Sequence, residues 1–115
     1  MFCTNTIDMW EAKLKKYDEL VAKCPRYERK GKTMPYTSAN GHMFSLLNKD
    51  GEIGIRFSKE VQKKYMEDFD TTIYRSYDSI MHGYILIPDH MLEDLDNVAR
   101  YLDESFDYVM SLESK

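Results

Sequence analysis

The dipeptide Asn40-Gly41 is the feature that most restricts how this chain can fold. Both residues tolerate the positive φ angles of a type I′ turn, so the pair predicts a two-residue β-hairpin loop. The segment NKDG at residues 48–51 indicates a second turn shortly afterwards. The chain around these turns is therefore expected to form a meander of three antiparallel strands.

The two turns also predict how the three strands align. A two-residue loop places Thr37 opposite Phe44, and a four-residue loop at 48–51 places Leu46 opposite Ile53. This register gathers five apolar side chains on one face of the sheet: Phe44, Leu46, Ile53, Ile55 and Phe57. A shift of one residue would scatter them, so the agreement supports the register. The opposite face is expected to carry Met43, Ser45, Gly54 and Arg56.

Three helices are predicted from apolar residues that recur at three- and four-residue steps. The first covers about residues 7–23 and ends before Pro25, because proline disfavours helical geometry in the residue before it. Ser58 is a natural N-cap for a second helix that continues to about Asp68. The last helix, at about 95–112, has one apolar stripe: Leu95, Val98, Ala99, Leu102, Phe106, Val109 and Met110.

Two further strands are expected between the second and third helices. TTIYRS at 71–76 has the β-branched and aromatic content of a strand, and GYILIP at 83–88 is a stronger strand pattern that ends at proline. Asp89 is expected to cap a short helical turn. The order is α-β-β-β-α-β-β-α, which predicts one α+β domain over residues 1–115, with an antiparallel sheet packed against the N- and C-terminal helices.

Composition favours a folded, cytoplasmic protein. Hydrophobic residues make up 43% of the chain and charged residues 31%, which is typical of globular domains. No apolar run is long enough to span a membrane, and the N-terminus lacks the pattern of a signal peptide. Two cysteines are too few for a disulfide framework and form no metal-type pair. No cofactor is expected.

Charge is unevenly distributed along the chain. Residues 1–34 carry a net charge of +3 and residues 89–115 a net charge of −6, which disfavours nonspecific binding to nucleic acid. The basic segment KCPRYERKGK at 23–32 is the exception. It leaves open an alternative in which the chain binds nucleic acid weakly through Arg26, Arg29, Lys30 and Lys32, with Tyr27 and Tyr36 stacking on bases.

No catalytic or metal-binding constellation is predicted. His82 and His90 are separated by a whole strand, roughly 20 Å at 3.3 Å per residue, so they cannot share a metal ion. His42 is interpreted as a hairpin residue and Cys24 as a buried structural thiol. The alternative of an enzyme or small-ligand protein stays open, through an unrecognised pocket at which His82, Asp78 or Tyr77 would converge.

Three tyrosines are not assigned to the predicted core. Tyrosine buries a large area while its hydroxyl keeps a hydrogen bond, so surface tyrosines often anchor protein partners. We therefore treat Tyr36, Tyr74 and Tyr77 as candidate partner contacts, beside the four basic residues of the 23–32 segment.

Two segments resemble the TfoX/Sxy N-terminal domain family. NGHMFSLLNKDGEIGIRFS at 40–58 is similar to the hairpin of that family, and the segment at 80–112 is similar to its M-x-G-Y-v-x-v-P-x-x-x-l motif and terminal helix. In the second segment Met81, Gly83, Tyr84 and Pro88 carry the resemblance. Two features differ: Pro35-Tyr36 replaces Phe-Gly in the R-x-M-F-G-G stretch, and the chain ends at Lys115 without the helical second domain of the two-domain regulators.

The resemblance implies a single-domain TfoX-N-like module. The best-known members regulate natural competence genes together with a cyclic-AMP-responsive transcription factor. We therefore expect a non-enzymatic regulatory module that binds a protein, which could be its own copy.

Overall fold

The structure is a computed structural model that describes residues 6–24, 26–31, 35–76 and 79–113. Its elements follow the order predicted from the sequence, and the short helical turn expected at Asp89 is a 3₁₀ helix before the last helix. The elements are α1 (Thr6–Ala22), β1 (Tyr36–Ala39), β2 (His42–Leu47), β3 (Ile53–Arg56), α2 (Lys59–Asp68), β4 (Ile73–Ser76), β5 (Ser79–Leu86), η1 (Asp89–Glu93) and α3 (Leu95–Met110).

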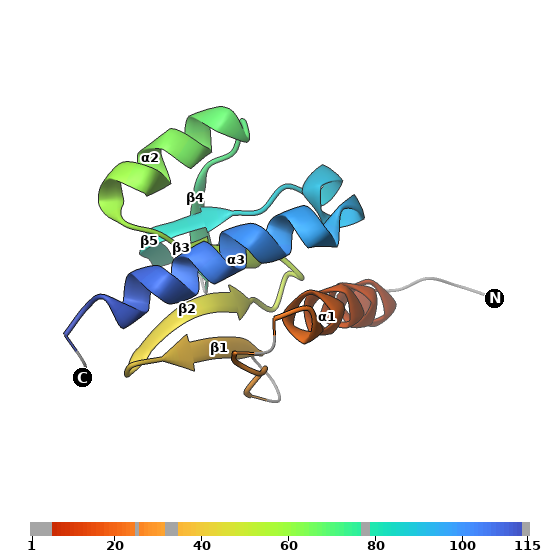
Figure 1. The fold of residues 1–115 in the computed structure, drawn as a ribbon. Helices are drawn as coiled ribbons and strands as arrows, with labels where there is room; N and C mark the ends of the chain where they lie inside the picture. The colour runs from red at the N-terminus through yellow and green to blue at the C-terminus, as the bar shows by residue number, and fades with distance from the viewer. Residues whose placement is uncertain (1–5, 25, 32–34, 77–78, 114–115) are drawn as a thin grey trace.

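The five strands form one antiparallel sheet in the order β1-β2-β3-β5-β4. Figure 1 shows α3 lying across the sheet, with α1 beside the ends of β1 and β2 and α2 near β5. All three helices contribute apolar side chains to the same core, which includes Tyr17, Leu20, Phe44, Ile55, Ile85, Val98 and Leu102. The predicted α+β class, with an antiparallel sheet packed against the N- and C-terminal helices, is confirmed.

The predicted register is correct beside the Asn40-Gly41 turn, where Ala39 pairs with His42, but is wrong by one residue in the rest of the meander. Thr37 pairs with Ser45, whereas Ser38 pairs with Met43, so Phe44 is an extra residue that bulges from β2. Ile53 pairs with Leu47 rather than with Leu46. A bulge lets two successive residues of one strand oppose a single residue of its neighbour, and no spacing in the sequence marks its position.

The side chain of Asn48 explains the shift between β2 and β3. Its Oδ1 accepts the backbone N–H groups of Asp50 and Glu52 at 3.0 and 2.9 Å. Asn48 itself closes the loop by donating its backbone N–H to the Glu52 carbonyl oxygen. The turn is thus one residue longer than predicted. As a result Leu47 enters the core, and Leu46 points to the opposite face of the sheet.

A second, smaller cluster lies on that opposite face. It is built from Leu46, Tyr74 and Tyr84, with Tyr36, Met43, Met81 and Leu86 partly buried around it. The Tyr74 ring lies over Gly54, and its hydroxyl donates to the Glu52 carbonyl oxygen at 2.8 Å. Asn48 also donates its side-chain amide to the carbonyl oxygen of Arg75 at 2.9 Å. The β4–β5 hairpin therefore bends back across this face.

The Asn40-Gly41 turn has a second role beyond forming the hairpin. Asn40 has a φ of 56° and Gly41 a φ of 80°, as the predicted turn requires. The Asn40 amide donates hydrogen bonds to the carbonyl oxygens of Val109 and Leu112, at 3.0 and 2.7 Å. One of these carbonyl groups belongs to the last turn of α3 and the other to the residues that follow the helix, so Asn40 fixes the end of α3 to the hairpin.

Of the helix caps predicted at Ser58 and Asp89, only the first is present. Ser58 caps α2 as predicted, because its hydroxyl accepts the N–H of Val61 at 3.3 Å. The N-cap position of η1 is occupied by Pro88, so the predicted capping role of Asp89 is wrong. The Asp89 carboxylate instead pairs with Lys13 of α1. Pro25 lies outside the described residues.

Candidate interaction surface

The cations of the basic segment form ion pairs with distant acidic residues. The Arg26 guanidinium donates to Asp107 at 2.9 Å and to Asp103 at 3.2 Å, both on α3. These carboxylates, Asp107 first, raise the pKa of Arg26 above its ordinary value. Arg29 donates to Asp18 of α1 at 2.9 Å. The segment therefore ties α1 to α3, and both of its arginines are paired with carboxylates although Arg26 stays exposed.

The remaining members of the basic segment are placed in different ways. Lys30 donates to the Ser38 hydroxyl at 3.4 Å, and Lys32 lies outside the described residues. Tyr27 is packed between Phe44 and Phe106, with ring centroids 5.0 Å from each. Burial raises the pKa of its phenol. One face of the Tyr27 ring is therefore stacked on Phe106 and is not open to a base.

The two candidate tyrosines that the structure describes, Tyr36 and Tyr74, do not form an exposed surface together. Tyr74 is completely buried in the second cluster, so it has no exposed face for a partner. Tyr36 is half-buried beside the same cluster, on edge strand β1. Tyr77, like Asp78, lies outside the described residues.

The three histidines lie in different parts of the fold. His42 is buried, and its Nε2 donates to the carbonyl oxygen of Glu113 at 2.7 Å. His82 is exposed on β5, and His90 is exposed in η1. In the part of the chain that the structure describes, no three His, Cys, Asp or Glu side chains are grouped as a metal ion would require.

The buried hydroxyl and thiol groups are held by structural contacts. The Tyr17 hydroxyl lies 2.6 Å from that of Ser45, which is also hydrogen-bonded to Thr37. The Cys24 thiol donates weakly to the Leu20 carbonyl oxygen at 3.8 Å. Desolvation raises the pKa of Cys24 and that of Tyr17. Raised pKa values keep these groups protonated, which makes both poor nucleophiles.

The side of α1 that faces away from the core is exposed over most of the helix length. Tyr17, Leu20 and Val21 are buried on the inner side. The exposed residues of the outer side are mainly charged or small: Glu11, Ala12, Lys15, Lys16, Glu19, Ala22 and Lys23. We call these residues, together with the half-exposed Asp18, the outer face of α1.

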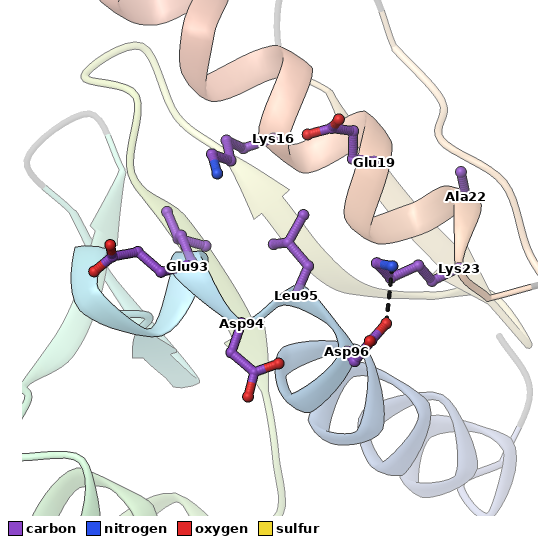
Figure 2. A pocket seen from close by; sticks show the side chains of 9 residues that line it. Lys16, Glu19, Ala22, Lys23, Glu93, Asp94, Leu95 and Asp96 are labelled. Carbon is purple, nitrogen blue, oxygen red and sulfur yellow. Dashed lines mark ion pairs between the residues drawn. The ribbon is translucent and has the colours of Figure 1, made fainter.

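A hollow of about 560 Å³ lies along one flank of this face, between α1 and the chain that enters α3. Figure 2 shows Lys16, Glu19 and Lys23 on the α1 wall, opposite a wall that carries Glu93, Asp94 and Asp96. The Lys23 ammonium bridges the hollow to Asp96 at 2.8 Å. This contact raises the pKa of Lys23.

A second hollow of about 620 Å³ lies along the other flank. Trp10 and Leu14 form its apolar floor, and Glu11, Lys15, Asp18, Glu19 and Ala22 line the rest. The Trp10 indole N–H donates to the Asn48 carbonyl oxygen at 3.0 Å, which fixes this end of α1 against the β2–β3 loop. The outer face of α1 is thus a ridge between two hollows.

The comparisons with known proteins add no relative to this description: no protein-family model matches the chain, and no curated protein matches it. Among the described residues, no helix is both long and apolar enough to cross a membrane.

The predicted contact residues did not include the outer face of α1. The apolar stripe predicts the helix but carries no information about the charged residues on its other side. The signal that could have identified them is the regular alternation of acidic and basic residues at four-residue steps, at Glu11, Lys15, Glu19 and Lys23.

Proposed function

We propose that this chain is a non-enzymatic protein-interaction module of the regulatory kind that its resemblance to the TfoX N-terminal domain implies. The observation that supports it best is the outer face of α1. This face is an exposed, rigid helix ridge flanked by two hollows. A helix held in place by core contacts loses little conformational freedom when a partner binds it, which favours association.

The anchoring of α1 supports its use as a binding element. Its N-terminal half is fixed by two different parts of the fold: Trp10 bonds to Asn48, and Lys13 pairs with Asp89. Toward its C-terminal end Asp18 pairs with Arg29. Binding surfaces on such rigid elements keep their side chains in place better than surfaces on loops.

The nucleic-acid alternative has less support. It requires free cations in the basic segment, whereas Arg26 and Arg29 form ion pairs with three aspartates. Each phosphate contact would have to replace an existing carboxylate contact, which removes much of the gain from counterion release. The small-ligand alternative would be supported by a pocket at which His82, Asp78 or Tyr77 converge; neither of the two hollows beside α1 is lined by His82.

A site-specific crosslinking experiment tests the proposal. A photo-reactive amino acid is placed at Ala22 on the outer face of α1, and a matched variant carries it at Lys63, an exposed residue of α2. We expect a discrete crosslinked protein from the Ala22 variant after irradiation of the native cells, and none from the Lys63 variant. Absence of any crosslinked protein from Ala22, at normal expression and folding of the variant, would contradict the proposal.

A further inference from the structure

The Asn40-Gly41 turn carries the two groups of a reaction that a chain can perform on itself. In an Asn-Gly sequence the glycine backbone nitrogen can attack Cγ of the asparagine side chain, because glycine has no Cβ atom to hinder the approach. Ala39 pairs with His42, so these two residues alone form the loop between them. Gly41 is exposed, and among the described residues no backbone hydrogen bond of a loop or turn uses its N–H. Its nitrogen is therefore open to solvent.

The native turn keeps the two reacting atoms apart. Asn40 has a φ of 56° and Gly41 a φ of 80°, as in a type I′ turn, whose first central residue has a ψ of about 30°. At this ψ the Gly41 nitrogen is turned away from Cβ of Asn40 about the Cα–C bond, whereas ring closure requires the two atoms to be nearly eclipsed. The Asn40 side chain is also held at α3, because Nδ2 donates to the carbonyl oxygens of Val109 and Leu112 at 3.0 and 2.7 Å. The reaction therefore requires the turn to open and to leave α3.

We propose that Asn40 is a site of self-modification, and that loss of its amide releases the C-terminal end of α3 from the β1–β2 hairpin. The Gly41 nitrogen forms a bond with Cγ of Asn40, and the Cγ–Nδ2 bond breaks. The proton of the Gly41 nitrogen passes through water to Nδ2, which leaves as ammonia. A water molecule then opens the cyclic imide at one of its two carbonyl carbons, which gives aspartate or isoaspartate. Water is the only co-reactant, and the inference does not depend on the proposed function.

The aspartate product cannot replace the hydrogen bonds that the asparagine amide made. An ionised carboxylate only accepts hydrogen bonds, so it would face the carbonyl oxygens of Val109 and Leu112 without a donor between them. The C-terminal end of a helix carries a negative partial charge, which disfavours a nearby anion. α3 has no basic residue in its last turn to offset this charge. The product therefore repels the segment that Asn40 held.

The isoaspartate product has a further effect on the hairpin itself. Its main chain runs through Cγ, so the loop between Ala39 and His42 gains an extra backbone carbon atom. Loop length and turn type fix the register of a hairpin, so the ends of β1 and β2 are displaced. His42 is affected directly, because its Nε2 bonds to the Glu113 carbonyl oxygen at 2.7 Å and forms the second tie to the segment after α3. Both ties to that segment therefore weaken.

Opening of the turn and the reaction at Asn40 reinforce each other. Only molecules in which the turn has left α3 can react, so the population of this local opening sets the rate. Neither product can re-form the two bonds of the Asn40 amide, so the modified chain keeps the opened form. The modification thus converts a reversible local opening into a permanent one.

Ageing of the purified full chain tests whether the reaction occurs. The chain is kept in mildly alkaline buffer, with and without enough urea to unfold it, and peptide mass spectrometry measures the conversion of Asn40. We expect conversion in both samples, at least about tenfold slower in the folded chain, because only the opened fraction reacts. The alternative explanation is that Asn40 only fixes the hairpin to α3 and never leaves it in the folded chain. A folded chain that is unmodified after about a hundred times the period that converts the unfolded chain overturns the proposal, and so do equal rates in both samples.

Other asparagines of the same chain provide an internal control. Asn48 and Asn97 are followed by lysine and valine, whose side chains hinder attack by the next backbone nitrogen. Both should stay unmodified in the folded chain while Asn40 is converted. Conversion of Asn48 or Asn97 at the rate of Asn40 would show that the Asn40-Gly41 turn is not a distinct site, and it overturns the proposal.

A substitution tests the structural consequence separately. Asn40→Asp introduces the first product, and we expect amide hydrogen exchange in the last turn of α3 at least about tenfold faster than in the wild type. Asn97→Asp makes the same chemical change in the first turn of α3, where negative charge is favourable, and should leave that exchange unchanged. Wild-type exchange in Asn40→Asp overturns the proposal, and so does an equal effect of Asn97→Asp. If Asn40→Asp does not fold, the same exchange measured on modified molecules separated from the aged wild-type chain gives the decision.

Discussion

Replacement of Gly54 by alanine tests the packing of the second cluster. A Cβ atom on Gly54 would lie 2.6 Å from Cε2 of Tyr74, and closer still to Cγ and Cδ2. Carbon atoms pack best at about 3.5–4.0 Å, so the ring would have to retreat by about 1 Å. The ring is completely buried, and its hydroxyl is fixed by the Glu52 carbonyl, so no free space receives it.

The size of the effect follows from three contributions. Overpacking of a filled site costs about 1–3 kcal/mol, and disturbing the Tyr74 hydrogen bond adds about 1 kcal/mol. Gly54 does not have a positive φ, so alanine would also restrict the unfolded chain and recover about 0.4–1 kcal/mol. The clash prevails. We expect the free energy of unfolding to fall by about 2–3 kcal/mol, which corresponds to a lower melting temperature by about 10 °C.

Urea unfolding of the Gly54→Ala variant, monitored by circular dichroism, measures this loss. The same substitution in a Tyr74→Leu background should cost less than about 1 kcal/mol, because leucine lacks the ring atoms that clash. An unfolding midpoint equal to or above that of the wild type would refute the reasoning. A cost that is the same in both backgrounds would show that the Tyr74 ring is not the cause.

Two further predictions concern the end of α3 and the buried tyrosines. Asn40→Gly keeps the turn conformation but removes both side-chain hydrogen bonds to the carbonyl oxygens of Val109 and Leu112. We expect faster amide hydrogen exchange in the last turn of α3. Unchanged exchange there would contradict the role of Asn40 in fixing the end of this helix. Burial raises the pKa of Tyr17 and Tyr74, and that of Tyr84 to about 12. The folded chain then keeps protons that the unfolded chain releases near pH 10, so stability should be intact below about pH 10 and fall as the pH rises. Urea midpoints measured across this range, with tyrosinate absorbance, test it; a flat profile would be inconsistent with buried phenols.

The order of elements could be predicted because it depends on local patterns. The Asn40-Gly41 turn, the Ser58 cap and the apolar stripe of the last helix each involve residues close together in the chain. The register could not be predicted in the same way. Between β1 and β2 it depends on the bulge at Phe44. Between β2 and β3 it depends on the Asn48 side chain, whose hydrogen bonds to the backbone stabilise a turn one residue longer than a plain hairpin would have.

The position of the Tyr74 side chain could not be predicted from the sequence either. Its strand was predicted, and an edge strand ordinarily presents side chains to solvent. The β4–β5 ladder is interrupted, and Gly83 has a φ of 88° within β5. This bend carries Tyr74 over Gly54, where it forms a core that no periodicity in the sequence indicates.

Charge in this chain has to be interpreted together with the fold. The basic segment is conspicuous in the sequence, yet Arg26 and Arg29 are paired with carboxylates 11 to 81 residues away in the chain. The outer face of α1 is balanced in charge and therefore inconspicuous, but its residues are exposed together on one helix. A surface of low net charge can be specific when its charges are ordered, because a partner docked out of register meets repulsion at several positions.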